Sequence, residues 1–185
     1  MPTLGHAIFD TALGPCAVVW SARGLRHFLL PEVSEARLRA RIARELGLTE
    51  PAPPPAPVRA AIELARRHLG GAPQDLTGIA IDLDGRAPFT CRVYRALRRI
   101  GPGRTVSYAE LAERAGSPRA ARAVGQAMAN NPLALVVPCH RVLGAHGQPG
   151  GFSAAGGAAT KAKLLALEGV ELSLSTDRRS RRRRS

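Results

Sequence analysis

The chain has 185 residues, with 27 Lys and Arg against 14 Asp and Glu, so its formal net charge is +13. With 45% hydrophobic and 22% charged residues, its composition is that of a folded globular protein and not of a disordered chain. No apolar run approaches the roughly 18 residues of a membrane-spanning helix. The first residues lack the basic and apolar regions of a secretory signal, so we expect an intracellular protein without membrane contact.

The charge is spread unevenly along the chain. Residues 1–87 carry a net charge of +1, residues 88–177 carry +6, and residues 178–185 hold six Arg and no acid. A basic C-terminal half favours a polyanionic partner, most commonly nucleic acid. The alternatives are that the tail only aids solubility and that the excess of Arg over Lys reflects genome composition. We expect residues 178–185 to be disordered.

The N-terminal half predicts a small sheet with helices. Three short β-like runs predict an antiparallel meander: residues 7–9, 16–20 and 25–30. Apolar residues recur every four positions over residues 34–46 and predict a helix, with Ser34 as its cap and Gly47 as its stop.

Further elements follow before residue 88. The proline-rich residues 51–57 predict a stiff linker that forms neither helix nor sheet. A second helix is expected from about 58 to 69, ended by Gly70 and Gly71, and weak alternation over 79–83 predicts another strand.

From Pro88 onward the pattern is helical. Apolar residues from Phe89 to Ile100 share one helical face. Ser107 and Glu110 form a capping box for a short helix that ends near Ala115. Ser117 and Pro118 are expected to begin the next helix, over residues 119–130. Two short helices with arginines on the second are typical of a DNA-binding helix-turn-helix, although a plain helical hairpin has the same pattern.

The three cysteines lie far apart and predict neither a disulfide framework nor a structural zinc site. We interpret Cys16 and Cys91 as buried or half-buried structural thiols. Three histidines are interpreted as surface or core residues rather than metal ligands: His6, His27 and His68.

The residues around Cys139 are more typical of a reactive thiol than those around Cys16 and Cys91. The apolar residues 133–137 predict a buried strand or extended segment before it, and His140 follows it. If Cys139 opens a helix, the first N–H groups of that helix would stabilise a thiolate. A Cys-His pair alone is also compatible with a buried thiol beside an incidental histidine.

A series of motifs in one order narrows these alternatives: Ser-Tyr at 107–108, Arg-Ala-Ala-Arg-Ala-Val-Gly-Gln-Ala-Met at 119–128, Asn-Asn-Pro at 130–132, Pro-Cys-His-Arg-Val at 138–142, Gly-Gly-Phe-Ser at 150–153 and Lys-Leu-Leu-Ala-Leu-Glu-Gly at 163–169. Over roughly residues 88–170, the chain strongly resembles the O6-alkylguanine-DNA alkyltransferases. The resemblance implies an α/β fold: a strand-and-helix domain with a small antiparallel sheet over 1–87, and a mostly helical, winged-helix-like domain over 88–177.

The resemblance also implies a chemistry. The alkyl group on O6 of guanine in DNA would pass to Cys139, which would then be used up, so each molecule would act once. His140 would take the thiol proton through a water molecule, and Glu168, near the end of a helix over residues 161–169, would orient His140. Tyr108 would donate a hydrogen bond to N3 of the leaving guanine.

Further residues carry family roles in DNA and substrate binding. Arg122 would enter the base stack in place of a flipped nucleotide, with the helix in the minor groove of double-stranded DNA. The DNA-contacting set also includes Ser107 and Ala121. The substrate pocket would comprise four residues: Pro138, Val142, Phe152 and Ser153. Asn131 would brace the active-site turn. Phe152 stands where many relatives have Tyr, so a hydroxyl contact would be lost there.

Some relatives bind a structural zinc through N-terminal Cys and His residues, but Cys16, His6 and His27 do not fall in the matching places, so we expect no metal and no cofactor. We expect a cytoplasmic monomer that associates with the nucleoid when bound to DNA. O4-alkylthymine is a second candidate lesion. One alternative function is a non-catalytic DNA-binding module that senses alkyl lesions. Another is an unrelated thiol hydrolase that uses Cys139 and His140 and turns over.

Overall fold

The computed structural model describes residues 4–144 and 147–172. Its N-terminal part contains the predicted antiparallel meander. Its strands are β1 (Gly5–Phe9), β2 (Cys16–Ser21) and β3 (Gly24–Leu29), in the order β1-β2-β3. Every residue of the central strand β2 is buried. A strand buried on both faces needs a covering layer on each side.

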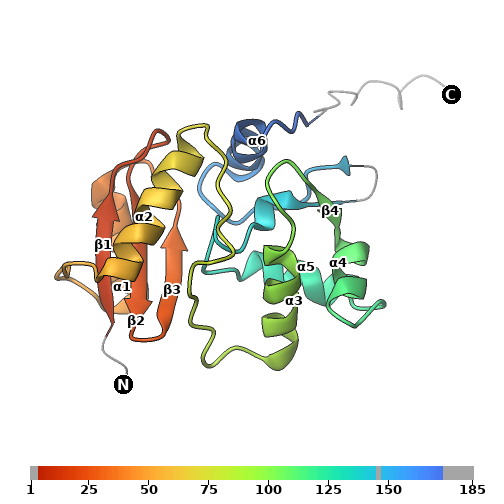
Figure 1. The fold of residues 1–185 in the computed structure, drawn as a ribbon, viewed down its shortest axis with the longest axis horizontal. Helices are drawn as coiled ribbons and strands as arrows, with labels where there is room; N and C mark the ends of the chain where they lie inside the picture. Colours follow the sequence, from red (N-terminus) through yellow and green to blue (C-terminus); the bar gives the residue numbers. More distant parts are fainter. Residues whose placement is uncertain (1–3, 145–146, 173–185) are drawn as a thin grey trace, which may run out of the picture.

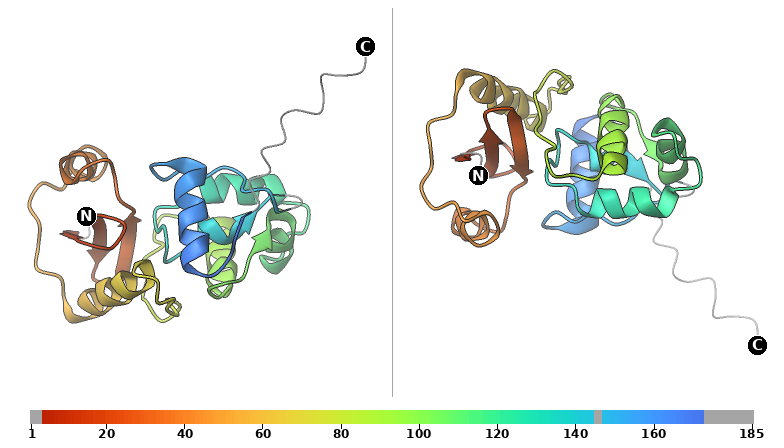
Figure 2. Two further views of the ribbon diagram at one scale, coloured as in Figure 1. Left: turned by 90° about the horizontal axis from the view of Figure 1, so that it is seen from above. Right: turned by 90° about the horizontal axis from the view of Figure 1, so that it is seen from below.

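Two helices supply these layers. Helix α1 (Glu35–Leu46) and helix α2 (Ala56–Leu69) cover opposite faces of the sheet (Figures 1 and 2). Ala17 packs with α1, whereas its neighbours Cys16 and Val18 belong to the cluster that contains α2. This alternation follows from the period of two in a strand. The predicted cap and stop of α1, Ser34 and Gly47, are confirmed.

Two predictions for this part are wrong in detail. Helix α2 begins at Ala56, inside the predicted linker, because Pro57 lies in its first turn, where no backbone N–H is needed. Residues 79–83 form no strand. Ile81 makes only an isolated bridge with Leu25, and the chain turns away at once, with the N–H of Asp84 donating to the Asp82 side chain at 3.0 Å.

The C-terminal part packs beside this sheet and is mostly helical (Figure 2). It contains the following elements: α3 (Pro88–Arg98), β4 (Val106–Ser107), α4 (Tyr108–Arg114), α5 (Ala121–Ala129), the 3-10 helix η1 (Cys139–Arg141), β5 (Val142–Leu143) and α6 (Gly157–Leu167). Strands β4 and β5 pair in parallel. The pairing of β4 and β5 places the start of α4 next to the segment that carries Cys139. No helix among the described residues is long and apolar enough to cross a membrane.

The predicted helix pair is present as α4 and α5. The capping box is confirmed: the Glu110 N–H donates to the Ser107 hydroxyl at 3.1 Å, and the Ser107 N–H donates to the Glu110 carboxylate at 2.7 Å. The start of the second helix was predicted too early. Pro118 lies in the connecting turn, α5 begins at Ala121, and Ser117 makes no side-chain cap.

The apolar residues before Cys139 form a buried turn instead of a strand. The N–H of Val137 donates to the Leu133 carbonyl at 2.8 Å, and Leu135 has a φ of 71°. The last helix, α6, begins at Gly157 rather than at residue 161 and ends at Leu167, one residue before Glu168. The tail predicted to be disordered, residues 178–185, lies outside the described residues.

Candidate active site

Cys139 lies at the wall of a cavity of about 350 Å³ between α4, α5 and the segment around residue 152. The cavity is lined by these residues: Tyr108, Gly125, Met128, Ala129, Cys139, Gly151, Phe152 and Ser153. Four residues predicted from widely separated motifs therefore meet at one cavity: Tyr108, Cys139, Phe152 and Ser153. The cavity has the size of a small-molecule site with a single nucleophile at its wall.

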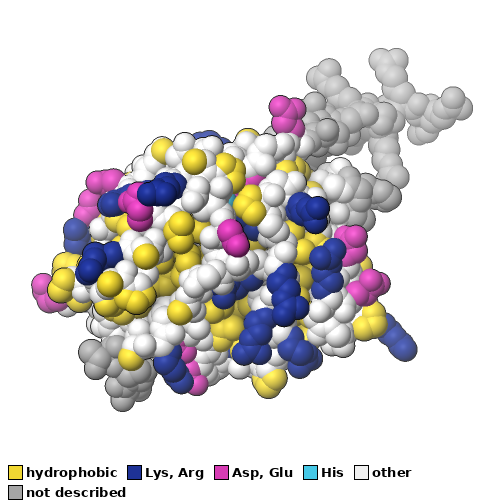
Figure 3. Space-filling view, viewed as in Figure 1, with side chains coloured by type: hydrophobic (Ala, Val, Ile, Leu, Met, Phe, Trp, Pro, Cys, Tyr) yellow, Lys and Arg dark blue, Asp and Glu magenta, His cyan; other side chains and the backbone are white. Residues whose placement is uncertain are grey.

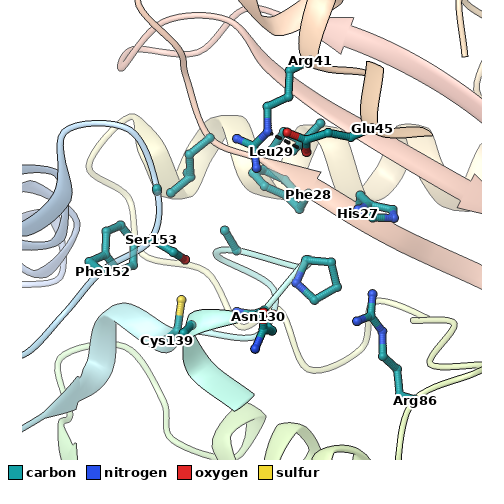
Figure 4. A pocket seen from close by; sticks show the side chains of 16 residues that line it. His27, Phe28, Leu29, Arg41, Glu45, Arg86, Asn130, Cys139, Phe152 and Ser153 are labelled. Atoms are coloured by element: carbon teal, nitrogen blue, oxygen red, sulfur yellow. Dashed lines mark hydrogen bonds and ion pairs between the residues drawn. The ribbon is translucent and has the colours of Figure 1, made fainter. Parts of the chain in front are cut away.

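A second hollow of about 290 Å³ adjoins Cys139 on the side of the N-terminal sheet. Figure 4 shows its lining, with the Cys139 sulfur pointing toward Ser153 and with His27, Phe28 and Leu29 of β3 across the space. Cys139 itself is only 6% exposed. The thiol is thus reachable from a pocket but not from the open surface.

Burial raises the pKa of the Cys139 thiol, although several neighbours oppose this effect. The Asn131 side chain, the charge of Lys161 and the backbone N–H groups of Cys139 and His140 all stabilise the thiolate. The predicted helical start is present in short form, since η1 begins at Cys139. In the unliganded site the thiol keeps its proton at neutral pH, so it needs a base to become a nucleophile.

His140, the next residue in the chain, is the candidate for that base. Its Nε2 lies 2.9 Å from Oε1 of Glu168, and both side chains are fully buried. Because an ionised carboxylate only accepts hydrogen bonds, the proton of the neutral ring lies on Nε2. Nδ1 has no hydrogen-bond partner among the described residues. Burial lowers the pKa of His140 despite the opposing effect of Glu168, so the ring is neutral and Nδ1 can accept a proton.

Besides His140, several other groups donate hydrogen bonds to Glu168. Arg141 donates to both of its oxygens, at 2.7 Å from one terminal nitrogen and 2.9 Å from Nε. His68 of α2 lies 2.9 Å from Oε1, and the N–H of Gly103 donates to Oε2 at 3.3 Å. Burial alone would raise the pKa of Glu168, but the hydrogen bonds of His140, His68 and Arg141 lower it well below its ordinary value. Glu168 is therefore a fixed negative charge.

Asn131 ties the turn before Cys139 together. Its side-chain amide donates to the Val137 carbonyl at 2.8 Å, and its oxygen accepts from the Leu133 N–H at 3.0 Å. One asparagine thus satisfies backbone groups at both ends of the apolar turn. This contact explains why residues 133–137 curl instead of extending, and it agrees with the bracing role predicted for Asn131.

Lys161 is a buried residue that the sequence did not single out. Its side chain is fully buried, and Nζ donates to the carbonyl of Val142 at 2.5 Å. Burial lowers the pKa of Lys161 to about 8, and Cys139 opposes this effect. The Val142 carbonyl already holds this one hydrogen bond and keeps a second lone pair. Two residues predicted for the substrate pocket line neither cavity: Val142, and Pro138 at the N-cap position of η1.

The predicted DNA-contacting residues lie on α4 and α5. Ala121 is the first residue of α5, Arg122 is exposed beside it, and Ser107 caps α4. Figure 3 shows basic side chains gathered over the half of the molecule that holds α3, α4 and α5. An exposed Arg next to small residues allows a helix to approach a polyanion closely.

Sequence reasoning missed three partners of the site: His68, Arg141 and Lys161. Arg141 stands in the reactive motif itself, so its position next to His140 was an available signal. His68 and Lys161 gave none, because a histidine in an amphipathic helix and a lysine in an Ala-rich helix are usually exposed. Across residues 4–144 and 147–172, no cluster of three or more His, Cys, Asp or Glu side chains could hold a metal ion.

Comparison with known proteins places this geometry in a family. Residues 88–170 match the profile of the "6-O-methylguanine DNA methyltransferase, DNA binding domain". A methylated-DNA–protein-cysteine methyltransferase of Mycobacterium tuberculosis H37Rv is 43% identical over 117 residues, which are 63% of this chain and 68% of that protein. The chain belongs to the methylated-DNA–protein-cysteine methyltransferase family. A Mycolicibacterium paratuberculosis methylated-DNA–protein-cysteine methyltransferase is 50% identical over 109 residues, 58% of this chain and 63% of that relative's length.

The structural comparison extends over more of the chain. The crystal structure of Mycobacterium tuberculosis OGT in complex with DNA matches with a TM-score of 0.69 and 33% identity. The match covers 89% of this chain and 93% of the Mycobacterium tuberculosis chain. The similarity therefore includes the N-terminal sheet, which the family profile leaves out, and the α/β fold with a helical C-terminal part is confirmed.

Proposed function

We propose that this chain repairs alkylated DNA by direct reversal, moving the alkyl group from O6 of guanine to its own Cys139. The observation that carries the proposal is a single thiol at the wall of a cavity, followed in the chain by a buried neutral base. Cys139 lines the cavity with Tyr108 and Ser153, and His140 is held by a buried ionised Glu168. Nothing in this arrangement requires a cofactor, because the alkyl group itself supplies the electrophilic carbon.

The proposed reaction is a single displacement. His140 takes the Cys139 proton at Nδ1 through a water molecule, and the thiolate attacks the alkyl carbon. The sulfur–carbon bond forms as the carbon–O6 bond breaks, and the electron pair leaves with the guanine. The Tyr108 hydroxyl, whose pKa burial raises, stays protonated and donates to N3 of the departing base. The thioether does not hydrolyse, so each molecule reacts once.

We further propose how the lesion reaches this cavity. A base within a duplex cannot contact the buried Cys139, so the nucleotide is flipped out of the stack. The exposed Arg122 fills the space that it leaves, with α5 in the minor groove, where sequence information is sparse. The protein acts as a monomer, and because its substrate is chromosomal DNA, it works in the cytoplasm at the nucleoid.

Intact mass measurement tests the proposal. After incubation with duplex DNA that contains O6-methylguanine, the protein is expected to gain the mass of one methyl group, located at Cys139. O4-methylthymine in the same duplex tests the second candidate lesion. Specific binding of lesion DNA without a mass change would instead favour the lesion-sensing alternative. Turnover of an ester or peptide without inactivation would favour the thiol hydrolase.

A further inference from the structure

His68 joins the N-terminal part of the chain to the active-site carboxylate. It lies near the end of α2, and its side chain is 1% exposed. Its Nε2 is 2.9 Å from Oε1 of Glu168, the same oxygen that lies 2.9 Å from Nε2 of His140. Two histidines from different halves of the chain thus meet at one carboxylate oxygen, and the reaction proposed above uses only one of them.

A second hydrogen bond of the His68 ring shows which of its nitrogens carries the proton. The backbone N–H of Gln74 donates to Nδ1 at 3.0 Å, so Nδ1 is the acceptor of the ring and Nε2 carries the proton. The contact forms because the chain reverses directly after α2 at Gly70 and at Gly71, which has a φ of 89°. His68 is therefore an oriented donor toward Glu168 and not an incidental buried ring.

We propose that His68 is a positioning residue for the alkyl transfer, acting through Glu168 on His140. This inference rests on the proposed function of Cys139. Arg141 donates to both oxygens of Glu168 and sets the plane of the carboxylate, and His68 adds a donor from α2 to Oε1, the oxygen that His140 contacts. The N-terminal part then contributes a residue to the reaction and not only a scaffold.

The charges around His140 give this role a measurable signature. Burial lowers the pKa of His140, Glu168 raises it and Arg141 lowers it, and Cys139 is the preceding residue in the chain. Removing His68 takes away one donor to Oε1 and leaves more of the Glu168 charge to act on His140. His140 then becomes easier to protonate. The acidic limb of the rate profile is expected to move to higher pH.

Three variants test the inference in single-turnover assays with O6-methylguanine duplex. His68→Leu removes the donor, His68→Gln places an amide N–H close to the position of Nε2, and His6→Leu makes the same change at another buried histidine, in β1. We expect His68→Leu to slow transfer about tenfold at neutral pH, as a misplaced base does. His68→Gln is expected to restore most of the rate, and His6→Leu to keep it.

The outcomes separate this inference from the proposed function. If the wild-type protein gains no methyl group, the proposed function itself fails. If the wild type transfers and His68→Leu transfers equally fast, His68 has no positioning role. A slow His68→Leu variant with an unchanged pH midpoint and no rescue by His68→Gln would show a role in folding alone, and would also overturn the inference. Thermal unfolding of each variant identifies a loss of fold.

Discussion

The buried residues around Glu168 and the exposed residues of α5 both depend on arginine, but in different ways. Arg141 is 4% exposed and donates to both oxygens of Glu168, with a further hydrogen bond to the Ile100 carbonyl. Arg122 is exposed, and within residues 4–144 and 147–172 its side chain makes no ion pair or hydrogen bond. One arginine is fixed by the fold, and the other is available to a partner.

This difference separates the two tasks that the proposed function requires. A buried ion pair works only in one geometry, is little screened by salt, and loses much when one partner is removed. An exposed arginine contributes to binding through charge and reach, so its effect varies with salt and with the form of the substrate. Substitutions in the two regions are therefore expected to fail in different assays.

The largest effect is expected at the nucleophile. Cys139→Ala should abolish alkyl transfer, because no other thiol lines the cavity. Binding to lesion DNA should persist, since the basic surface is unchanged. Gel-shift titration and intact mass measure the two properties on one sample. Cys91→Ala, at a partly exposed thiol in α3, is the matched control and should transfer normally. A methylated Cys139→Ala protein would contradict the assignment.

Glu168→Gln should show the cost of disturbing the buried region. The amide has one acceptor oxygen and a donor NH2 group, so Arg141 and His140 lose their ionised partner and Arg141 loses one of its two acceptors. We expect transfer to slow about 100-fold and the free energy of unfolding to fall by about 3–5 kcal/mol, as for a broken buried ion pair. Rapid-quench assays and denaturant titration measure these effects. Glu63→Gln, at an exposed pair with Arg67 in α2, should change neither. Equal behaviour of the two variants would remove the distinction between buried and exposed charge.

Arg122→Ala tests the exposed region. Because Arg122 is proposed to fill the base stack, we expect about a tenfold loss of rate with duplex DNA, in line with an unstacking cost of a few kcal/mol that is partly uncompensated. Transfer from the free modified base should be nearly unaffected. Arg119→Ala removes an equal charge from the adjoining turn and should mainly weaken binding. Equal slowing of Arg122→Ala on both substrates would rule out stack filling.

The pH dependence of the transfer rate tests whether His140 is the base. Burial lowers the pKa of His140 and raises that of Cys139. Neutral His140 is the active form, so the rate should stay nearly level through neutral pH and decline only below about 6.5, the ordinary histidine value. Single-turnover rates from about pH 5 to 9 measure this. A rate that instead rises tenfold per pH unit through neutrality would mean that the thiolate forms without His140.

The smallest effect on chemistry is expected from the six arginines of residues 178–185. Deleting them should flatten the dependence of log affinity on log salt, by up to about 5 at roughly 0.9 per phosphate contact. The rate of transfer at saturating DNA should not change. Fluorescence anisotropy at several salt concentrations provides the slopes. An unchanged slope would support the view that the tail only aids solubility.

Local signals in the sequence predicted much of this molecule. The capping box of Ser107 and Glu110, the ends of α1 and the three strands depend on residues near one another in the chain, and all were predicted. The strand expected at 133–137 was wrong because its shape depends on the Asn131 amide, which bonds two backbone groups of the apolar run. An apolar run alone does not distinguish a strand from a buried turn.

The same distinction between local signals and long-range contacts applies to the residues of the active site. The motifs around Cys139, His140 and Glu168 could be read because a family resemblance connected them. His68 and Lys161 could not, since their importance arises from contacts across 100 and 19 residues of sequence, respectively. The boundary at residues 87–88 stays a prediction, and the hydrophobic cluster that contains Leu69 and Leu97 extends across it.

Counting transferred methyl groups tests the central claim most directly. Duplex DNA with an isotopically labelled O6-methylguanine is added in excess, and the label on the protein is followed to completion and mapped by peptide mass spectrometry. The account predicts one label per protein molecule, at Cys139, with no further turnover and with unmodified guanine left in the DNA. Label on another residue, or release of more than one methyl group per protein, would contradict it.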